Sequence, residues 1–160
     1  MKARTLLAPL AVAGAVFAAS SFTATTAHAQ NCSHTIGSVL SLTGAYGTFG
    51  VPISRVAELA VSQVNEARAN MGVGCDLKYE VRDSQTQPTV AVDAAQKLID
   101  IEGVQAIVGP ISSGITGPLL TSVTVQKGAV VIATASTSTT FTNMAREGKT
   151  KGLFFRTLPA

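Results

Sequence analysis

Short apolar runs and longer amphipathic segments alternate along this chain from Thr35 to its end. The short runs are typical of buried β-strands, whereas the longer segments repeat apolar residues at three- and four-residue steps and indicate α-helices. The predicted strands cover residues 36–40, 77–81, 104–108, 129–133 and 154–158. The predicted helices cover residues 51–70, 89–101 and a stretch from 112–114 to about 126. Strands and helices that alternate in this order indicate an α/β domain with a parallel sheet.

The helix predicted over residues 51–70 has a clear amphipathic pattern. We expect its apolar stripe to face the sheet; the stripe consists of Ile53, Val56, Ala57, Ala60, Val64 and Ala67. The polar residues that fall mainly away from the stripe are Arg55, Glu58, Gln63, Glu66 and Arg68. In the helix over 89–101, the residues expected to face the sheet are Val92, Ala95, Leu98 and Ile99, with Val90 as a further candidate. The run 104–108 is apolar enough to be covered on both faces, like a central strand of a parallel sheet.

Residues 1–29 have the three-part pattern of a secretory signal peptide. A basic start is followed by an apolar run over residues 6–19 and by the small residues that end in Ala27-His28-Ala29. A transmembrane helix is the rival interpretation, but it needs about 20 apolar residues, and this run is shorter. We therefore expect cleavage after Ala29 and export to the periplasm.

The leader carries much of the positive charge of the chain. The whole sequence has 12 lysine and arginine residues against 9 acidic ones, a net charge of +3. Without Lys2 and Arg4 the net charge falls to +1. No lysine or arginine cluster remains after residue 29, so we expect no nucleic-acid partner. Residues 30–160 have the length of one domain.

The two cysteines stand just before the first and second predicted strands, at Cys32 and Cys75. Neighbouring parallel strands would bring them close together, and an oxidising compartment favours a disulfide between them. Such a bond would close a loop of about 44 residues and contribute about 4 kcal/mol. Two unpaired buried thiols are the alternative. No lipid anchor is expected, because Ala29-Gln30-Asn31 precedes Cys32 instead of the leucine-and-small-residue pattern of a bacterial lipoprotein.

Small and hydroxyl-bearing residues follow three of the predicted strands, in the segments 42–50, 110–114 and 134–138. In parallel sheets ligands bind outside the carboxyl ends of the strands, and free N–H groups at helix starts attract anions. These segments therefore predict a neutral, hydrogen-bonding pocket for a small carboxylate. Serine and threonine are also ordinary helix N-caps, and glycine is typical of a tight turn between strand and helix. The pattern alone leaves both interpretations open.

Several segments of the chain are similar, in the same order, to those of a known family. They are IGSVLSLTG at 36–44, AELAV at 57–61 with Asn65, VRDSQ at 81–85, residues 91–98, VGP at 108–110 with Ser112 and Ser113, and FRT at 155–157. This ordered set resembles the opening part of the branched-chain amino-acid (leucine/isoleucine/valine) binding proteins, the periplasmic substrate-binding components of ABC transporters. The resemblance covers essentially all of the chain after residue 29.

The resemblance implies a type I periplasmic binding fold, in which two lobes close on a solute like a hinged clamp and deliver it to a membrane permease. Residues 30–160 would then form the N-terminal lobe, a three-layer α/β unit with a parallel sheet, truncated before the second lobe begins. We expect a monomer without a cofactor. The expected solute is an amino acid or a similar small carboxylate or amide.

The resemblance also implies which residues contact the solute. In the family, the serine after strand three and the backbone and hydroxyl after strand four hold the α-carboxylate and amino group. Those positions match Ser113, and Ala135 with Thr137. Phe49 matches an aromatic residue at the pocket mouth that is commonly tyrosine, so a contact through its hydroxyl is not available here. Ser136 is a further candidate, and the hydroxyl-rich run around it departs from the family pattern and leaves the solute open.

Enzymatic functions find little support in the sequence. The glycines of the segment 42–50 are spaced G-x-x-G-x-x-G, not as the dinucleotide fingerprint G-x-G-x-x-G, and Asp83 is the only acidic residue placed to close the second strand. His34 lies before the first strand, so no histidine is placed to activate Ser113, and no Cys/His spacing suggests zinc. We therefore expect a binding protein without a metal. A ligand-sensing receptor or regulator of the same fold is the alternative, although the export signal argues against a cytoplasmic regulator.

Overall fold

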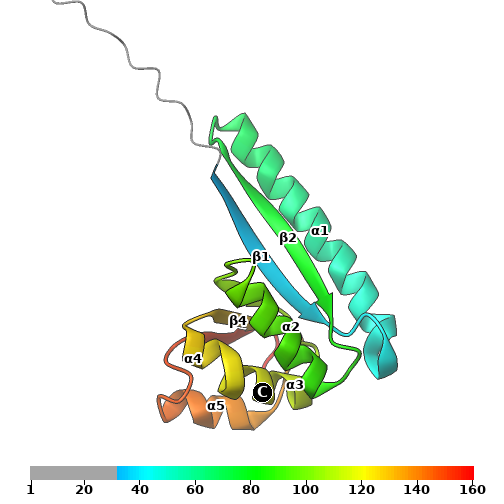
Figure 1. Ribbon diagram of the computed structural model, residues 1–160, viewed down its shortest axis with the longest axis vertical. Helices are drawn as coiled ribbons and strands as arrows, with labels where there is room; N and C mark the ends of the chain where they lie inside the picture. Colours follow the sequence, from blue (N-terminus) through cyan, green and yellow to red (C-terminus); the bar gives the residue numbers. More distant parts are fainter. Residues whose placement is uncertain (1–31) are drawn as a thin grey trace, which may run out of the picture.

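The computed structural model describes residues 32–160, drawn in colour in Figure 1. They form a five-stranded parallel sheet with the strand order β2-β1-β3-β4-β5. The strands are β1 (Cys32–Leu40), β2 (Cys75–Asp83), β3 (Ala106–Val108), β4 (Val130–Ala133) and β5 (Phe154–Arg156). All five predicted strands are present, and β1 and β2 are longer than predicted. The α/β class and the parallel sheet are thus confirmed. The expected signal peptide lies outside the described residues.

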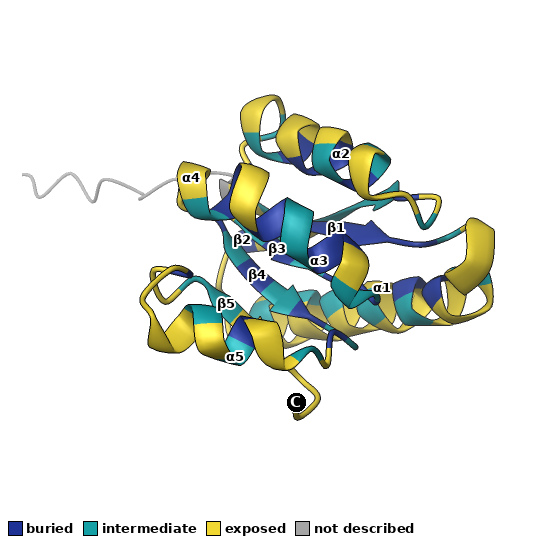
Figure 2. Cartoon of the chain, turned by 90° about the horizontal axis from the view of Figure 1, so that it is seen from below, coloured by how far each residue is buried: buried dark blue, intermediate teal, exposed yellow. Residues whose placement is uncertain are grey.

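Helical segments connect the strands. They are the 3-10 turn η1 (Gly44–Tyr46), α1 (Gly47–Asn70), α2 (Pro88–Asp100), α3 (Ser113–Leu119), the π-helical segment η2 (Leu120–Thr124), α4 (Val125–Lys127) and α5 (Thr139–Arg146). In Figure 2, α2, α3 and α4 lie over one face of the sheet and α1 lies over the other, which gives three layers. The third predicted helix therefore consists of three consecutive parts. Pro118 lies inside it and has no N–H to donate to the preceding turn.

The hydrophobic core lies between the sheet and the helices α2 and α3. It is a cluster of buried apolar side chains that includes Val39, Ala91, Ala95, Leu98, Ile107, Ile115, Leu119, Leu120, Val123, Val131 and Phe141. Removing this apolar surface from water is the main force that holds the layers together. The predicted sheet-facing positions of α2 are confirmed: Ala95 and Leu98 are fully buried, and Val92 and Ile99 pack partly buried against the cluster.

The face of α1 that contacts the sheet matches the predicted stripe only in part, because Ile53 and Ala57 are partly buried whereas the other four stripe residues are exposed. Val56 and Val64 are 67% and 43% exposed, and the buried residues of α1 are Gly50 and Ser54. The contact face runs from these two residues to the partly buried Asn65. The helix is therefore rotated away from the orientation that its apolar stripe predicts.

Polar contacts with the edge strand β2 explain this orientation of α1. The side chain of Asn65 donates to the carbonyl oxygen of Leu77 at 2.9 Å and accepts from the N–H of Leu77 at 2.8 Å. Those backbone groups have no neighbouring strand to pair with, because β2 ends the sheet. At the other end of α1, Gly50 is so close to β1 that an added Cβ would lie 1.9 Å from the carbonyl oxygen of Ser41. Backbone contacts at both ends thus fix the rotation of α1.

The helix α5 begins directly after the hydroxyl-rich segment 134–138, where the sequence pattern predicts no helix. Its threonines have low helix propensity, so the sequence pattern gives little sign of it. Ser138 caps the helix, with its Oγ accepting from the N–H of Thr140 at 3.2 Å. Phe141 attaches the helix to the core, where its ring centroid lies 5.1 Å from that of Phe154.

The register of β1 and β2 bears on the expected disulfide. The Cα atom of Cys32 lies opposite the Cα atom of Cys75 in this parallel pair. This placement agrees with the position predicted for the two cysteines, and the covalent bond itself stays a prediction. Between residues 32 and 160, no helix is both long enough and apolar enough to cross a membrane.

Candidate functional site

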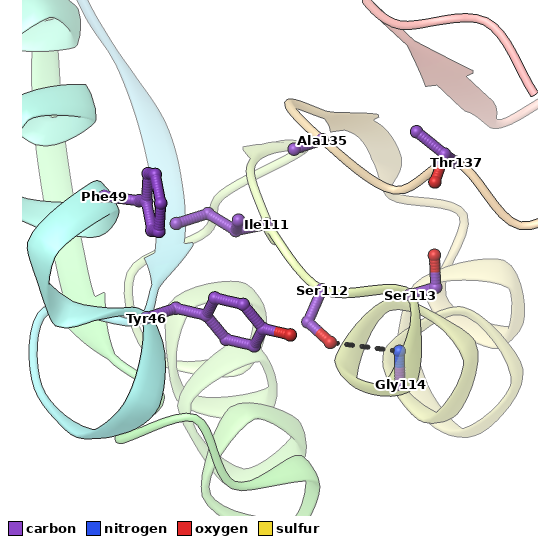
Figure 3. Close-up of a pocket in the computed structure, with 8 residues that line it drawn as sticks. All are labelled: Tyr46, Phe49, Ile111, Ser112, Ser113, Gly114, Ala135 and Thr137. Carbon is purple, nitrogen blue, oxygen red and sulfur yellow. Dashed lines mark hydrogen bonds between the residues drawn. The ribbon is translucent and has the colours of Figure 1, made fainter.

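A cavity of about 450 Å³ opens at the carboxyl edge of the sheet, where the segments that follow β1, β3 and β4 meet (Figure 3). Its lining residues are Tyr46, Phe49, Ile111, Ser112, Ser113, Gly114, Ala135 and Thr137. These residues come from the three segments that the sequence pattern predicts for a pocket. The cavity therefore lies where ligands bind in open parallel sheets.

Tyr46 and Phe49 form one wall of the cavity together with Ile111 (Figure 3). Tyr46 ends η1 and Phe49 lies in the first turn of α1, so a three-residue helical step places both rings on the same side. The rings are 39% and 60% exposed, whereas Ile111 is buried. Large exposed rings beside an open cavity offer apolar contact area to a ligand. We call these three residues the aromatic wall.

Ser113 and Thr137 form the opposite side of the cavity, and their hydroxyl groups point toward one another (Figure 3). The Oγ of Ser113 accepts a hydrogen bond from the N–H of Ser138 at 3.2 Å, which links the start of α3 to the loop after β4. The hydroxyl proton of Ser113 stays available as a donor. No hydrogen bond to another described residue engages the hydroxyl of the exposed Thr137. Both side chains can therefore donate to a bound acceptor such as a carboxylate.

The helix N-caps at this edge of the sheet are the serines next to Ser113 and Thr137, and not Ser113 and Thr137 themselves. The N-cap of α3 is Ser112, whose Oγ accepts from the N–H of Gly114 at 3.2 Å, and the N-cap of α5 is Ser138. Ser113 and Thr137 each stand one residue away from these caps. Capping therefore does not account for either of them.

The side chain of Ser136 does not line the cavity, although the sequence names it as a candidate. It is fully buried, and its Oγ lies 2.5 Å from the Oγ1 of Thr116 and 3.4 Å from the carbonyl oxygen of Pro110. These contacts hold the loop after β4 against α3. Arg156 holds the same loop from the other side, because its guanidinium donates to the carbonyl oxygen of Ser138 at 3.0 Å. The loop that carries the polar side of the cavity is thus fixed by buried polar contacts.

Four lining residues are absent from the set of candidates drawn from the sequence: Tyr46, Ile111, Ser112 and Gly114. Tyr46 could have been found, because it stands three residues before Phe49 in the same glycine-rich segment. The other three lie within segment 110–114, directly beside Ser113. Adjacent serines cannot be assigned to a cap or to a pocket before the first turn of the helix is known.

The cavity is electrically neutral. None of its lining residues carries a charge, so the polar groups that it offers are hydroxyls and backbone amides. Among residues 32–160, no three histidine, cysteine, aspartate or glutamate side chains gather in a way that could hold a metal ion. Such an arrangement can hold a polar small molecule by hydrogen bonds, and it presents no nucleophile with an adjacent base.

A parallel α/β sheet with a neutral cavity at its carboxyl edge, aromatic on one side and hydroxyl-bearing on the other, defines a small-molecule binding lobe. The chain belongs to the periplasmic binding protein family, whose family model matches residues 33–157. The resemblance seen in the sequence is therefore confirmed at the level of the family.

Two curated proteins show how much of such a protein the chain represents. It is 34% identical over 129 residues to the chemotactic signal transduction system substrate-binding protein BasB of Halobacterium salinarum, and 30% identical over 104 residues to the Leu/Ile/Val-binding protein BraC3 of Rhizobium johnstonii. The matches cover 78% and 65% of this chain. They cover 30% and 27% of the relatives, so the chain spans less than a third of their length.

Solved structures show the same fold. The branched-chain amino acid transporter substrate binding protein LivJ from Streptococcus pneumoniae, in complex with isoleucine, matches with a TM-score of 0.66 and 24% identity over 78% of this chain and 33% of its own. A solute binding protein of an ABC transporter from Rhodopseudomonas palustris BisB5, in complex with 3,4-dihydroxy benzoic acid, matches with a TM-score of 0.64 and 17% identity over 80% of this chain and 32% of its own. The fold of residues 32–160 is thus that of one lobe of a type I periplasmic binding protein.

Proposed function

We propose that this chain is the N-terminal lobe of an extracytoplasmic solute-binding protein that captures an amino acid or a similar small carboxylate for an ABC transporter. The observation that carries the proposal is the cavity with the aromatic wall on one side and the hydroxyls of Ser113 and Thr137, both still able to donate, on the other. We further propose that residues 1–29 are a signal peptide that directs the protein to the periplasm.

The two sides of the cavity suit two parts of one solute. The hydroxyls of Ser113 and Thr137 would donate hydrogen bonds to a carboxylate, and hydrogen bonds to a charged group are the stronger kind. The rings of Tyr46 and Phe49 would pack on the apolar part of the same molecule. Ala135 would contribute backbone groups next to Thr137.

The relatives support this class of solute. BraC3 is named as a Leu/Ile/Val-binding protein, and the LivJ structure holds isoleucine. A protein from Desulfitobacterium hafniense in complex with Leu is 26% identical to this chain, with a TM-score of 0.63. The Rhodopseudomonas palustris structure holds 3,4-dihydroxy benzoic acid. These solutes share a carboxylate joined to an aliphatic or aromatic body, a combination that the two sides of the cavity would suit.

A thermal-shift screen of the complete protein, with its second lobe and without the leader, tests this proposal. The panel would contain the common amino acids together with hydroxybenzoates. We expect at least one carboxylate to raise the melting temperature in a concentration-dependent way, because a solute that binds only the folded state stabilises it. A folded protein that no member of the panel stabilises would contradict the proposed function.

A sensory receptor is the second candidate function. BasB, the relative with 34% identity, is named as a chemotactic substrate-binding protein. The same cavity would then report a solute to a signalling partner instead of a permease. Crosslinking of the solute-loaded protein in membranes, followed by identification of the partner, distinguishes the two: a permease supports transport, and a chemoreceptor supports sensing.

A further inference from the structure

The aromatic wall stands on a segment that is attached to the end of the neighbouring strand. β1 and β2 pair along their whole length, and Leu40 lies opposite Asp83 in this register. The two strands therefore end side by side. Residues 41–50, which carry Tyr46 and Phe49, leave the sheet directly beside the segment that follows β2.

Asp83 accepts four hydrogen bonds, three from this segment and one from its own segment after β2. Its Oδ1 accepts from the N–H groups of Leu42 at 2.9 Å and Thr43 at 3.2 Å, and from the N–H of Gln85 at 2.8 Å. Its Oδ2 accepts from the hydroxyl of Thr43 at 2.6 Å. No cation pairs with this carboxylate within the described part of the chain, so its charge is balanced by these donors.

Thr86 forms a second attachment three residues further on. Its Oγ1 donates to the carbonyl oxygen of Thr43 at 3.1 Å and accepts from the N–H of Tyr46 at 3.3 Å. Between the two attachments the chain turns at Gly44, where φ is +78° and an added Cβ would lie 2.5 Å from the carbonyl oxygen of Gln85. The turn is thus pressed against the segment after β2, and η1 starts from a fixed position.

We propose that Asp83, which does not line the cavity, is a positioning residue for solute binding because it holds the segment from which Tyr46 and Phe49 project. This inference rests on the proposed function. An aromatic side chain contributes most to the binding free energy when it is already held where the solute will lie. Otherwise, ordering the side chain on binding costs conformational entropy and weakens the affinity. Asp83 and Thr86 would provide that order before the solute arrives.

A double-mutant cycle tests this proposal in the complete protein. Calorimetry would measure the affinity for L-leucine, or for the member of the screening panel that the wild-type protein binds. The variants are Asp83→Ala, Phe49→Ala and the double variant. If Asp83 acts through the wall, its removal weakens binding about tenfold, or about 1.4 kcal/mol, in the wild-type background. In the Phe49→Ala background the same change should weaken binding by no more than about threefold, because the two residues are coupled.

Three further variants keep the test decisive. Asp83→Asn retains an oxygen for the three N–H groups and should bind within about threefold of the wild type. Asp76→Ala, at the exposed start of the same strand, should bind like the wild type. If Asp83→Ala does not fold, Thr86→Val removes the second attachment and takes its place in the cycle.

The outcomes separate this inference from the proposed function. Wild-type protein that binds no member of the panel overturns the proposed function and this inference with it. Wild-type binding combined with full affinity in folded Asp83→Ala overturns the positioning role alone. Equal weakening in both backgrounds also overturns it, because Asp83 would then act independently of Phe49.

Discussion

Ser113 and Thr137 differ from the other hydroxyl residues at this edge of the sheet because neither caps a helix and neither is used inside the core. We expect Ser113→Ala and Thr137→Val each to weaken solute binding about tenfold to a hundredfold, the loss of a hydrogen bond worth roughly 1.5–3 kcal/mol to a charged group. Thr137→Val should leave stability nearly unchanged, whereas Ser113→Ala also removes the acceptor of the Ser138 N–H and should lower the free energy of unfolding by about 1 kcal/mol. Calorimetry and thermal melting of the complete protein measure both quantities.

The matched control for this pair is Thr121→Val. Thr121 is exposed on η2 and its hydroxyl donates to the carbonyl oxygen of Gly117, away from the cavity. This variant should keep full affinity. Unchanged affinity in both Ser113→Ala and Thr137→Val would remove these residues from the site.

Asp83 also makes stability depend on pH. Burial tends to raise the pKa of its carboxyl group, but the hydrogen bonds from the Thr43 side chain and from the N–H groups of Gln85, Thr43 and Leu42 outweigh burial and lower the pKa below 3.8. A lowered pKa in the folded state stabilises the protein above the unfolded value. This contribution is lost as the pH falls through the folded pKa.

Thermal melting of the wild type and of Asp83→Asn between neutral pH and about pH 2 tests this dependence. The wild type should be the more stable protein at neutral pH. The difference should shrink as the pH falls below about 4, where the carboxylate becomes protonated. A difference that stays constant over this range would show that the charge of Asp83 contributes nothing.

Single residues also show where sequence reasoning reaches its limit. The segments around Ser113 and Thr137 could be predicted because parallel strands bring their carboxyl ends together. The role of each hydroxyl group could not be predicted, because the side chains of Ser112, Ser113 and Ser136 differ only in the direction that the folded backbone gives them. Ser112 caps a helix at the cavity wall, Ser113 faces the cavity without capping, and Ser136 is buried against Thr116.

Among the elements, α1 shows how polar contacts can override an apolar stripe. Asn65 satisfies both backbone groups of Leu77 on the edge strand, so Asn65→Ala leaves them unpaired. We expect this variant to lose roughly 1–3 kcal/mol of unfolding free energy. Val56→Ala, on the exposed side of α1, should change it by less than about 0.5 kcal/mol. Urea unfolding of the complete protein without residues 1–29 measures both, and the reverse ranking would support the orientation that the apolar stripe predicts.

The order of the elements follows from the sequence, whereas the details of two helices do not. Alternating apolar runs and amphipathic segments predict the five strands and the three long helical regions. The rotation of α1 depends on Asn65 and on the close approach at Gly50, and neither appears in a hydrophobic pattern. α5 depends on one buried side chain, Phe141, and on the cap at Ser138. Such tertiary contacts decide local structure where propensity is weak.

The pairing of β1 with β2 places the two cysteines opposite each other and supports the proposed disulfide. In protein isolated from the periplasm, denatured without reduction, a thiol reagent should label neither Cys32 nor Cys75. Reduction before labelling should expose both. Two labelled thiols in the unreduced sample would contradict the disulfide.

At the scale of the whole molecule, the cavity is open to solvent. The chain covers 33% of the LivJ structure, and we propose that a second lobe closes over the solute in the complete protein. Residues 30–160 alone should therefore bind weakly or not at all. Micromolar binding of an amino acid to these residues alone would contradict the two-lobe account.

The most direct test of the central claim compares an acid with its alcohol. Calorimetry would titrate the complete protein with the amino acid that gives the largest shift in the screen, and then with the corresponding amino alcohol, which lacks the carboxylate. We predict micromolar binding of the acid and a loss of affinity of at least about a hundredfold for the alcohol, because the donors at Ser113 and Thr137 would lose their charged acceptor. Equal affinity for both compounds would contradict the account.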